Sequence, residues 1–385
     1  MKTRTTALTA VALLAACGAA FAAEGKLKTF LGDSKFEIQQ VFKGGRFPNV
    51  VVAVDGTVLA FWGGAKVRRS VDGGKSWGTE IPIAKGHMGG GVTVNETNRD
   101  IFTFIGKRHP PTTETVYRSQ DHGKTWSAVD AEIKLDSNGN KPQMHMAEHG
   151  ITLLHGKHKG RLLRPTRVYK SPAYNNAIYS DDGGKTWHCS GAFPIEGTGE
   201  GAVAELSNGH VYYSSRNHRF KDLADFRYQR PFAWSYDGGK TWRDAGYHRK
   251  LPDGPRYRGR KRRGACYNGH FGMMCGLVRL PVEKRDILIY SNADTPCHRR
   301  IRMTVWASFD GGKTWPLKRL VFKGPGAYSS LAAGRGGTKS EGWIYLLFES
   351  RGARFARFNL SWLLKGEKTG DGQLPEWARG GVSDR

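Results

Sequence analysis

The sequence has 385 residues and carries 60 Lys and Arg against 34 Asp and Glu, which gives a formal net charge of +26. Its 51 glycines and 11 tryptophans, together with the scarcity of long apolar runs, favour many short strands and tight turns over helices packed on a parallel sheet. We therefore predict an all-β protein. Beyond the N-terminus no stretch reaches the roughly 20 apolar residues of a membrane-spanning helix, so we expect no transmembrane segment.

The N-terminus has the pattern of an export signal. Lys2 and Arg4 precede the apolar residues 5–16, a run too short to span a bilayer as a mature helix. A small-x-small site closes a signal peptide at residues 1–22, whereas the Leu-Ala-Ala-Cys sequence ending at Cys17 resembles a lipoprotein box that would leave this cysteine acylated. Under either interpretation we predict bacterial export, to the medium, the periplasm or the cell envelope.

The positive charge indicates a polyanionic partner. An exported protein meets acidic polysaccharide, lipopolysaccharide or sialylated glycan before it meets nucleic acid, so we expect an acidic glycan and no nucleic acid. The densest basic run, residues 256–263, is interpreted as a solvated surface loop, with a dedicated binding patch as the alternative.

Four cysteines follow Cys17, and their spacing is not that of a zinc or redox site. They are Cys189, Cys266, Cys275 and Cys297. We therefore expect no metal and no cofactor. One or two disulfides can form in an oxidising compartment, with Cys266 and Cys275 as the nearest pair.

One octapeptide pattern, Ser-x-Asp-x-Gly-Lys-Ser/Thr-Trp, recurs five times. Its copies begin at Ser70, Ser119, Ser180, Ser235 and Ser308. The aspartate can accept backbone N–H bonds within a turn, and the following glycine supplies a positive φ. Each copy follows a β-rich stretch and so predicts one small antiparallel sheet, and sheets repeated radially form a propeller. Residues 342–364 with the strand 36–42 would complete a sixth blade, so we predict one six-bladed β-propeller domain over residues 23–385.

These octapeptides resemble the Asp boxes of bacterial and animal sialidases. In that family the boxes are structural and lie on the propeller rim away from the active face, so function depends on other residues. The resemblance spans about residues 36–364 and implies an exo-glycosidase that acts on an acidic sugar. Sialidases hold the carboxylate of the sugar with three arginines, because guanidinium forks bind carboxylates bidentately and stay charged.

The resemblance places these three arginines. Arg46 lies in Gly-Arg-Phe-Pro, at the position of the family's Phe/Tyr-Arg-Ile-Pro motif. Arg216 ends a run that resembles the family's Glu-x-x-x-x-Glu-Leu, Asp/Asn-Gly, strand and Arg-Asn pattern, and the first glutamate of that run is Glu200. Arg300 lies eight residues before the serine of the last box, the usual family spacing, with Arg299 and Arg302 as neighbours that blur the choice.

The same resemblance supplies a nucleophile. The segment Gly-Ala-Tyr-Ser-Ser-Leu is similar to the family's Ala-Tyr-Ser-Asp/Ser-Leu signature and makes Tyr328 the expected nucleophile. Sialidases are an exception among retaining glycosidases in using tyrosine. An anionic nucleophile would meet the carboxylate of the substrate, whereas a phenol activated by Glu200 would not. Glu349, in a segment that looks like the family's closing strands, is expected to orient Arg46.

The resemblance fails at one position. Sialidases place an aspartate acid/base between the first arginine and the first box, but from Arg46 to Ser70 the only carboxylate is Asp55, whose surroundings are typical of a hairpin turn. We therefore predict that the usual acid is missing. His87 is the best substitute as a third catalytic residue, because histidine titrates near neutrality; a polar histidine on the rim is the alternative.

The leading prediction is an exported retaining exo-α-sialidase, or a hydrolase of a related nonulosonic acid. Two rivals remain. A non-catalytic propeller that binds acidic glycans is favoured by the missing aspartate, and a hydrolase or lyase of uronic-acid polysaccharide would also need converging arginines. A panel of acidic glycans separates the three.

Overall fold

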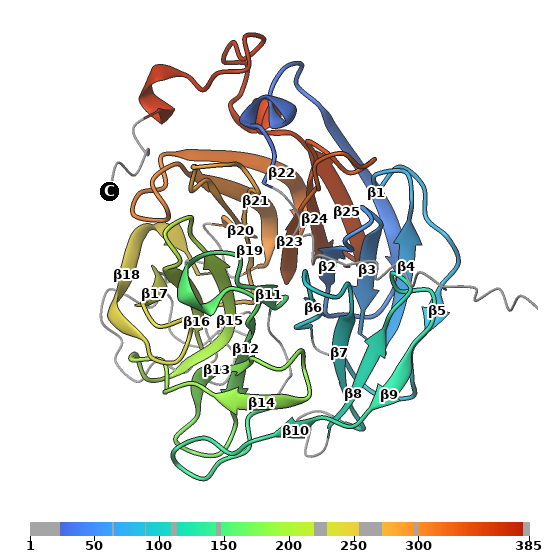
Figure 1. Ribbon diagram of the computed structural model, residues 1–385. Coiled ribbons are helices and arrows are strands. Elements are labelled where there is room, and N and C mark those ends of the chain that lie inside the picture. The colour runs from blue at the N-terminus through green and yellow to red at the C-terminus, as the bar shows by residue number, and fades with distance from the viewer. Residues whose placement is uncertain are drawn as a thin grey trace, which may run out of the picture.

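The chain forms a ring of six β-sheets around a central axis (Figure 1). The computed structural model describes residues 24–63, 65–88, 90–108, 114–143, 148–218, 229–253, 272–295 and 299–379. Within them almost every regular element is a strand. The predicted all-β, six-bladed β-propeller is confirmed.

The blades are numbered from the N-terminus by their innermost strand. Blade 1 runs outwards through β2 (Asn49–Val52), β3 (Val58–Trp62), β4 (Lys66–Ser70) and β5 (Ile81–Pro82). Blade 2 contains β6 (Thr93–Val94), β7 (Ile101–Gly106), β8 (Glu114–Ser119) and β9 (Ser127–Val129). Blade 3 contains β11 (Ile151–Thr152), β12 (Leu162–Val168), β13 (Tyr174–Ser180), β14 (Thr186–Cys189) and β10 (Glu132–Ile133).

The second half of the ring follows the same plan. Blade 4 contains β15 (Thr198–Glu205), β16 (Val211–Asn217), β17 (Gln229–Ser235) and β18 (Arg243–Pro252). Blade 5 contains β19 (Gly276–Arg279), β20 (Leu288–Ala293), β21 (Ile301–Ser308) and β22 (Leu317–Pro325). Blade 6 contains β23 (Ser329–Ala333), β24 (Ile344–Glu349), β25 (Gly352–Phe358) and β1 (Phe36–Lys43).

The ring is closed by strands from the two ends of the chain. In Figure 1 the blue strand β1 lies beside the red strand β25, and the two pair antiparallel from Phe36 opposite Phe358 to Lys43 opposite Gly352. The sixth blade therefore contains the predicted segment 342–364 and β1 as its outermost strand, and it also contains β23, which precedes that segment.

Burial falls from the axis to the rim. Every residue of β15 and of β24 is buried, whereas the outer strand β22 alternates between buried and exposed positions. Inner strands have a neighbouring blade on each face, whereas outer strands such as β22 keep part of their side chains in water. Charged side chains on inner strands are consequently held out of water.

The five Asp boxes form the predicted corners. Ser119 donates to Asp121 at 2.8 Å, and the carboxylate accepts the backbone N–H of Thr125 at 2.9 Å. The serine and backbone contacts recur at Asp72, Asp182, Asp237 and Asp310. Partial burial opposes ionisation, but these hydrogen bonds outweigh it and lower the pKa of Asp121 to about 2.

The tryptophan of each box packs between blades. Trp187 is fully buried and meets the edges of Phe102 and Phe104 from the preceding blade. Gly184 has φ +94°, and a Cβ there would lie 2.7 Å from the Phe102 ring. Only glycine fits this close approach, which explains the fixed glycine of the repeat.

Four short helices complete the described chain: η1 (Leu27–Phe30), η2 (Gly156–His158), α1 (Leu360–Leu363) and η4 (Glu376–Ala378). Within the described residues none is long and apolar enough to cross a bilayer. The signal segment with Cys17, the basic run 256–263 and the cysteines Cys266 and Cys297 lie outside the described residues.

The sequence left disulfide pairing open, with Cys266 and Cys275 as the nearest pair; in the structure Cys275 is a free, buried thiol. The guanidinium of Arg230 donates to its sulfur at 2.9 Å. Cys189 is also free.

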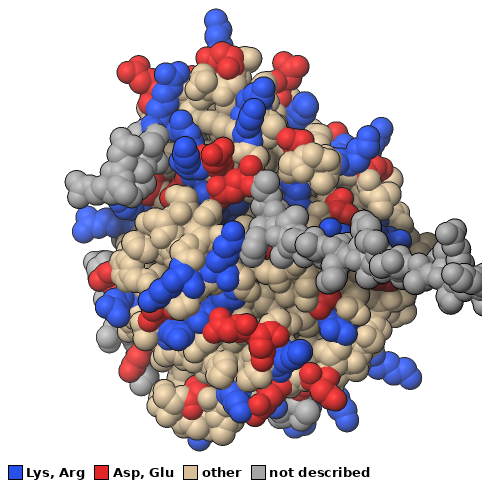
Figure 2. All heavy atoms as spheres, viewed as in Figure 1, with Lys and Arg blue, Asp and Glu red and all other residues tan. Residues whose placement is uncertain are grey.

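Positive side chains are spread over the surface. On the face in Figure 2, Lys and Arg project from the whole outline and alternate with Asp and Glu. The excess of positive charge is therefore distributed rather than gathered into one field on this face.

Candidate functional site

The predicted site residues come from strand ends that face the same way along the axis. Arg46 precedes β2, Tyr328 precedes β23, and Glu200 lies near the start of β15. Antiparallel pairing brings the end of β16, with Arg216, beside the start of β15, and the end of β24, with Glu349, beside the start of β23. The topology therefore gathers these side chains at one end of the central channel.

Tyr328 is the centre of this cluster. Its hydroxyl donates to Glu200 Oε1 at 3.1 Å and accepts from Arg216 Nη1 at 2.9 Å. The same nitrogen of Arg216 lies 2.7 and 2.6 Å from the two oxygens of Glu200. All three residues are buried. The hydroxyl thus directs its proton at a carboxylate while a guanidinium donates to its oxygen.

Glu200 is held ionised by its neighbours. Burial alone would favour the neutral carboxyl, but the positive charges of Arg216 and Arg167 outweigh it and hold the pKa of Glu200 well below its usual range. An ionised carboxylate in hydrogen-bond contact with a hydroxyl is the arrangement of a general base.

Arg46 and Glu349 form the predicted pair. Arg46 Nε and Nη2 donate to the two oxygens of Glu349 at 3.1 and 3.2 Å, and the backbone N–H of Phe47 donates to the same carboxylate at 3.0 Å. The Arg46 guanidinium lies 4.8 Å from the Phe47 ring centroid and 5.0 Å from that of Tyr328. Its side chain is 50% exposed, so a fixed cation faces solvent beside the tyrosine.

The backbone at Phe47 is strained. Its φ of +69° is a conformation that residues other than glycine rarely adopt. The observation fits a functional position, because local strain persists where surrounding contacts fix it.

Arg300 is the third arginine at Tyr328. Its guanidinium lies 5.1 Å from the tyrosine ring centroid, and its Nη2 donates to the carbonyl of Gly272 at 3.0 Å. No carboxylate in the described part of the chain forms an ion pair with it, and burial lowers its pKa. Of the three neighbouring candidates, Arg302 instead donates to the carbonyl of Asp294. A half-buried cation without a carboxylate partner can accept a bound anion.

His87 lies at the edge of the cluster. Its ring meets Phe47 edge to face at 5.1 Å between centroids, and Phe47 lies 6.0 Å from Tyr328 by the same measure. Phe47 thus lies between the histidine and the tyrosine. The role of His87 as a proton donor stays a prediction.

The sequence also matches a described family. The profile of the BNR repeat-like domain covers residues 64–339. The chain belongs to this family. It is 30% identical to a sialidase of Micromonospora viridifaciens over 83% of this chain and 52% of that protein. It is 27% identical to a sialidase of Bacteroides fragilis over 64% of this chain and 47% of that protein. The BNR-repeat chain thus spans about half the length of these curated relatives.

Solved structures support the fold. The Hadza microbial sialidase Hz136 superposes with a TM-score of 0.64 at 22% identity, over 83% of this chain and 66% of that one. The leech intramolecular trans-sialidase superposes with a TM-score of 0.63 at 15% identity, over 91% of this chain and 71% of that one. With the family match, these likenesses make the BNR-repeat chain a sialidase-like propeller, as its sequence predicts.

A fourth arginine lies in the Tyr328 cluster and was not predicted from the sequence. Arg167, on β12, is 2% exposed and lies 3.7 Å from Glu200 through Nη1. The available signal is the strand sequence Leu-Leu-Arg-Pro-Thr-Arg-Val, which places two arginines on a strand expected to be buried. Buried arginines are rare unless they have a specific partner.

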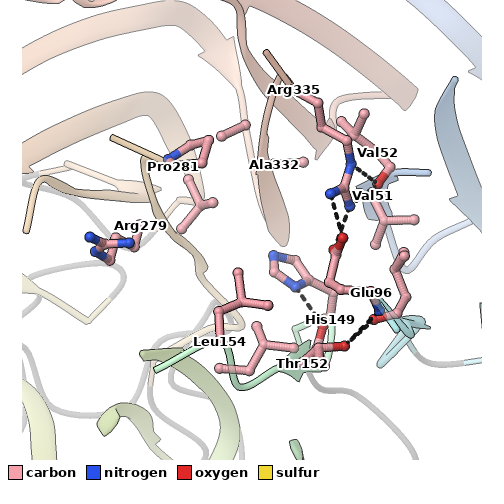
Figure 3. Close-up of a pocket in the computed structure, with 15 residues that line it drawn as sticks. Val51, Val52, Glu96, His149, Thr152, Leu154, Arg279, Pro281, Ala332 and Arg335 are labelled. Atoms are coloured by element: carbon pink, nitrogen blue, oxygen red, sulfur yellow. Dashed lines mark hydrogen bonds and ion pairs between the residues drawn. The ribbon is translucent and has the colours of Figure 1, made fainter. Parts of the chain in front are cut away.

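A cavity of about 180 Å³ lies at the opposite end of the channel (Figure 3). It is lined by residues at the far ends of β2 and β23, including Val52 and Ala333. Arg335 and Glu96 face each other across its wall, with two N–O distances of 2.7 and 2.6 Å. No predicted site residue lines this cavity.

Among the described residues no group of three or more His, Cys, Asp or Glu is arranged to hold a metal ion. The Tyr328 cluster offers instead a hydroxyl, a carboxylate that can accept its proton, and several guanidiniums. Such a set can bind a carboxylate and attack a carbon next to it.

Proposed function

We propose that this propeller is a retaining exo-α-sialidase-type glycoside hydrolase that releases a terminal sialic acid, or a related nonulosonic acid, from glycoconjugates. One observation carries the proposal. The guanidiniums of Arg46, Arg300 and Arg216 lie 5.0, 5.1 and 5.9 Å from the ring centroid of Tyr328. Three cations around the ring of one tyrosine fit a sugar that bears a carboxylate beside the bond that breaks.

The charge balance supports an anionic substrate. Arg46 and Arg216 each have a carboxylate partner, whereas the described contacts of Arg300 leave its charge uncompensated. A substrate carboxylate would supply the missing negative charge through charge-assisted hydrogen bonds. The sialidases of Micromonospora viridifaciens and Bacteroides fragilis support the same class of substrate by similarity.

The proposed reaction has two displacements at the anomeric carbon. In the first, the Tyr328 oxygen bonds to that carbon, Glu200 accepts the hydroxyl proton, and the leaving oxygen departs with a proton from an acid. In the second, the deprotonated acid accepts a proton from water as the water oxygen attacks the same carbon, the bond to the tyrosine breaks, and Glu200 returns the proton to the tyrosine oxygen. Two inversions retain the configuration of the sugar.

We propose His87 as the acid, through its place beside Phe47. Asp55 does not compete for the role, because its carboxylate accepts both the N–H and the hydroxyl of Thr57 in the turn after β2, at the far end of that strand from Arg46. The lack of another carboxylate between Arg46 and Ser70 favours a second candidate function, a propeller that binds acidic glycans without cleaving them.

The test is the release of sialic acid from an aryl α-sialoside and from sialyllactose, with Tyr328→Phe as the inactive control. Release from both supports a hydrolase with a relocated proton donor. Release from the aryl substrate alone overturns the assignment of His87, because an aryl leaving group needs little protonation. No release, with calorimetric binding of sialic acid, supports the binding propeller, and cleavage of a uronic-acid polysaccharide instead would replace the proposed substrate.

A variant sharpens the assignment of the acid. His87→Ala should lower turnover of sialyllactose at least tenfold more than turnover of the aryl sialoside, since only the first leaving group depends on a proton donor. An equal loss on both substrates would contradict the role.

We also propose export of the chain, because residues 1–22 have the pattern of a signal peptide. Mass spectrometry of the N-terminus after expression in a bacterium with an outer membrane tests it. Cleavage after Ala22 supports a soluble exported form, an acylated Cys17 supports a lipoprotein, and an intact Met1 would contradict export.

A further inference from the structure

Blade 3 places a buried arginine on each of its faces. Arg164 and Arg167 lie three residues apart on β12, so their side chains leave opposite faces of the sheet. Arg164 donates to the carbonyls of Gly90 and Gly91 in blade 2 at 3.1 and 2.7 Å. Arg167 points the other way, to blade 4 and Glu200. Arg164 thus connects blades 2 and 3 through backbone carbonyls, and Arg167 contacts Glu200, the proposed general base.

The guanidinium of Arg167 is fixed by three contacts. Nη2 lies 3.0 Å from Nδ1 of His218, which must accept because arginine can only donate. Nη1 lies 3.7 Å from Glu200 Oε1, the oxygen that accepts from Tyr328. The central carbon of the guanidinium lies over the ring of Tyr169, 4.1 Å from the ring centroid.

The position of His218 is in turn built into the fold. A Cβ on residue 199 would lie 2.7 Å from the His218 ring, so glycine at that position makes room for the imidazole. The backbone N–H of His218 donates to the carbonyl of Gly197 at 3.0 Å. The contacts therefore run from Gly199 through His218 and Arg167 to Glu200 and Tyr328.

We infer that Arg167, oriented by His218, is a positioning residue that holds Glu200 ionised and aimed at the hydroxyl of Tyr328. Arg216 shares its Nη1 between both carboxylate oxygens and the hydroxyl of the tyrosine, so Arg167 is the second cation at Oε1. Arg167 contacts the carboxylate from blade 3 and leaves Arg216 able to turn toward a substrate. The effect of Arg167 on catalysis rests on the proposed function. Its stabilisation of the Glu200 carboxylate does not depend on any substrate.

The substrate-independent test is a double-mutant cycle on thermal unfolding, with Arg167→Met, Glu200→Gln and the double variant. If Arg167 acts through Glu200, the loss of Tm caused by Arg167→Met should shrink by at least half in the Glu200→Gln background. Equal losses in both backgrounds would overturn the inference. Arg164→Met is the matched control, because it removes a buried arginine from the same strand and should give additive losses with Glu200→Gln.

The catalytic test uses the pH profile. The acidic limb of kcat/KM reports the ionisation of Glu200 in the free enzyme, so Arg167→Met should move it to higher pH and lower kcat by about tenfold to a hundredfold, with KM changed less than threefold. Arg167→Lys, which restores the charge, should recover part of the shift. His218→Gln, which keeps an acceptor, should have a smaller effect and covers the case of a variant that does not fold.

An acidic limb that stays in place while activity falls in proportion to folded protein would reduce Arg167 to a structural role. If the wild-type protein cleaves no sialoside, the proposed function fails, and the unfolding cycle still decides the inference about Arg167 and Glu200.

Discussion

Strand β15 carries a buried glutamate toward each end of the channel, and the two are held in opposite ways. Near its start, Glu200 meets Arg216 and Arg167, which hold its pKa well below the usual range despite burial. At its end, Glu205 accepts the backbone N–H groups of Leu154 and His155 at 2.6 and 3.1 Å, and burial raises its pKa to about 7. One strand thus buries two carboxylates, and only Glu200 forms ion pairs with arginines of the neighbouring strands.

The arginines at the two ends of the channel differ in whether they have a carboxylate partner. In the far cavity Arg335 has a carboxylate of its own in Glu96, and Arg279 has Asp286 and Glu24. At the Tyr328 end the described contacts leave Arg300 without a carboxylate. An arginine that is paired with a carboxylate contributes to the stability of the fold, whereas a cation without such a partner is available to an anionic ligand.

The largest effect should follow the removal of one oxygen at the Tyr328 end. Tyr328→Phe keeps the ring contacts with Phe47 and Arg46, so the protein should fold, but it removes the proposed nucleophile. We expect kcat for an aryl α-sialoside to fall at least a thousandfold, roughly 4 kcal/mol in activation free energy. Tyr345→Phe, which removes another buried tyrosine hydroxyl, is the control, and unchanged turnover in Tyr328→Phe would contradict its role.

A pair of arginine variants tests the charge balance directly. Arg300→Met should weaken binding of a sialic acid glycal at least a hundredfold, about 3 kcal/mol, with stability unchanged or raised. Arg335→Met should leave binding unchanged and lower the free energy of unfolding by about 2–3 kcal/mol, because Glu96 loses its partner. Calorimetry and urea unfolding measure the two quantities; loss of the same property in both variants would remove the distinction between the two ends.

The two glutamates should give opposite pH dependences of stability. The pKa of Glu205 is raised in the folded protein, so its contribution is complete below the unfolded value near 4.5 and is lost as the pH rises through about 7. The pKa of Glu200 is lowered, so its contribution is present above 4.5 and is lost as the pH falls. Glu205→Gln should therefore gain stability over the wild type between pH 5 and pH 8, by on the order of 3 kcal/mol.

Urea unfolding at the two pH values measures this gain, with Glu200→Gln as the control whose stability relative to the wild type should stay nearly constant between them, because the Glu200 contribution is lost only as the pH falls below about 4.5. A Glu205→Gln variant whose stability differs from that of the wild type by the same amount at both pH values would contradict the raised pKa.

The smallest effect belongs to the rim, far from both ends. Asp121→Ala removes the acceptor of a backbone N–H and a serine hydroxyl in one Asp box. Water can replace part of these contacts, so we expect a loss of about 1 kcal/mol in unfolding free energy and no change in sialoside turnover. A change in turnover beyond the loss of folded protein would give the boxes a role outside structure.

Local sequence was enough to predict most of the fold. The Asp-box turns depend on contacts within about five residues, as at Ser119 and Asp121, so each box identifies a blade. Closure by β1 and β25 could be predicted because the sixth blade has no box of its own and needs a partner strand. The face toward which Arg164 or Arg167 points depends on the register of β12, which sequence did not supply.

The site was predicted through family resemblance more than through pattern. Tyr328 and Glu200 are 128 residues apart, and no local periodicity brings them together. The strained φ of Phe47 and its place between Tyr328 and His87 depend on packing across blades. The same holds for the support of Glu200 by Arg167, which no motif marks.

The most direct test of the central claim is labelling with a 2,3-difluorinated sialic acid, followed by mass spectrometry of the intact protein and of its peptides. The fluorine substituents slow the second displacement, so a retaining mechanism leaves the sugar on the nucleophile. We predict one adduct, located on Tyr328, absent in Tyr328→Phe and strongly reduced in Arg300→Met. No adduct on a wild-type protein that cleaves sialosides, or an adduct on Glu200, would contradict the account.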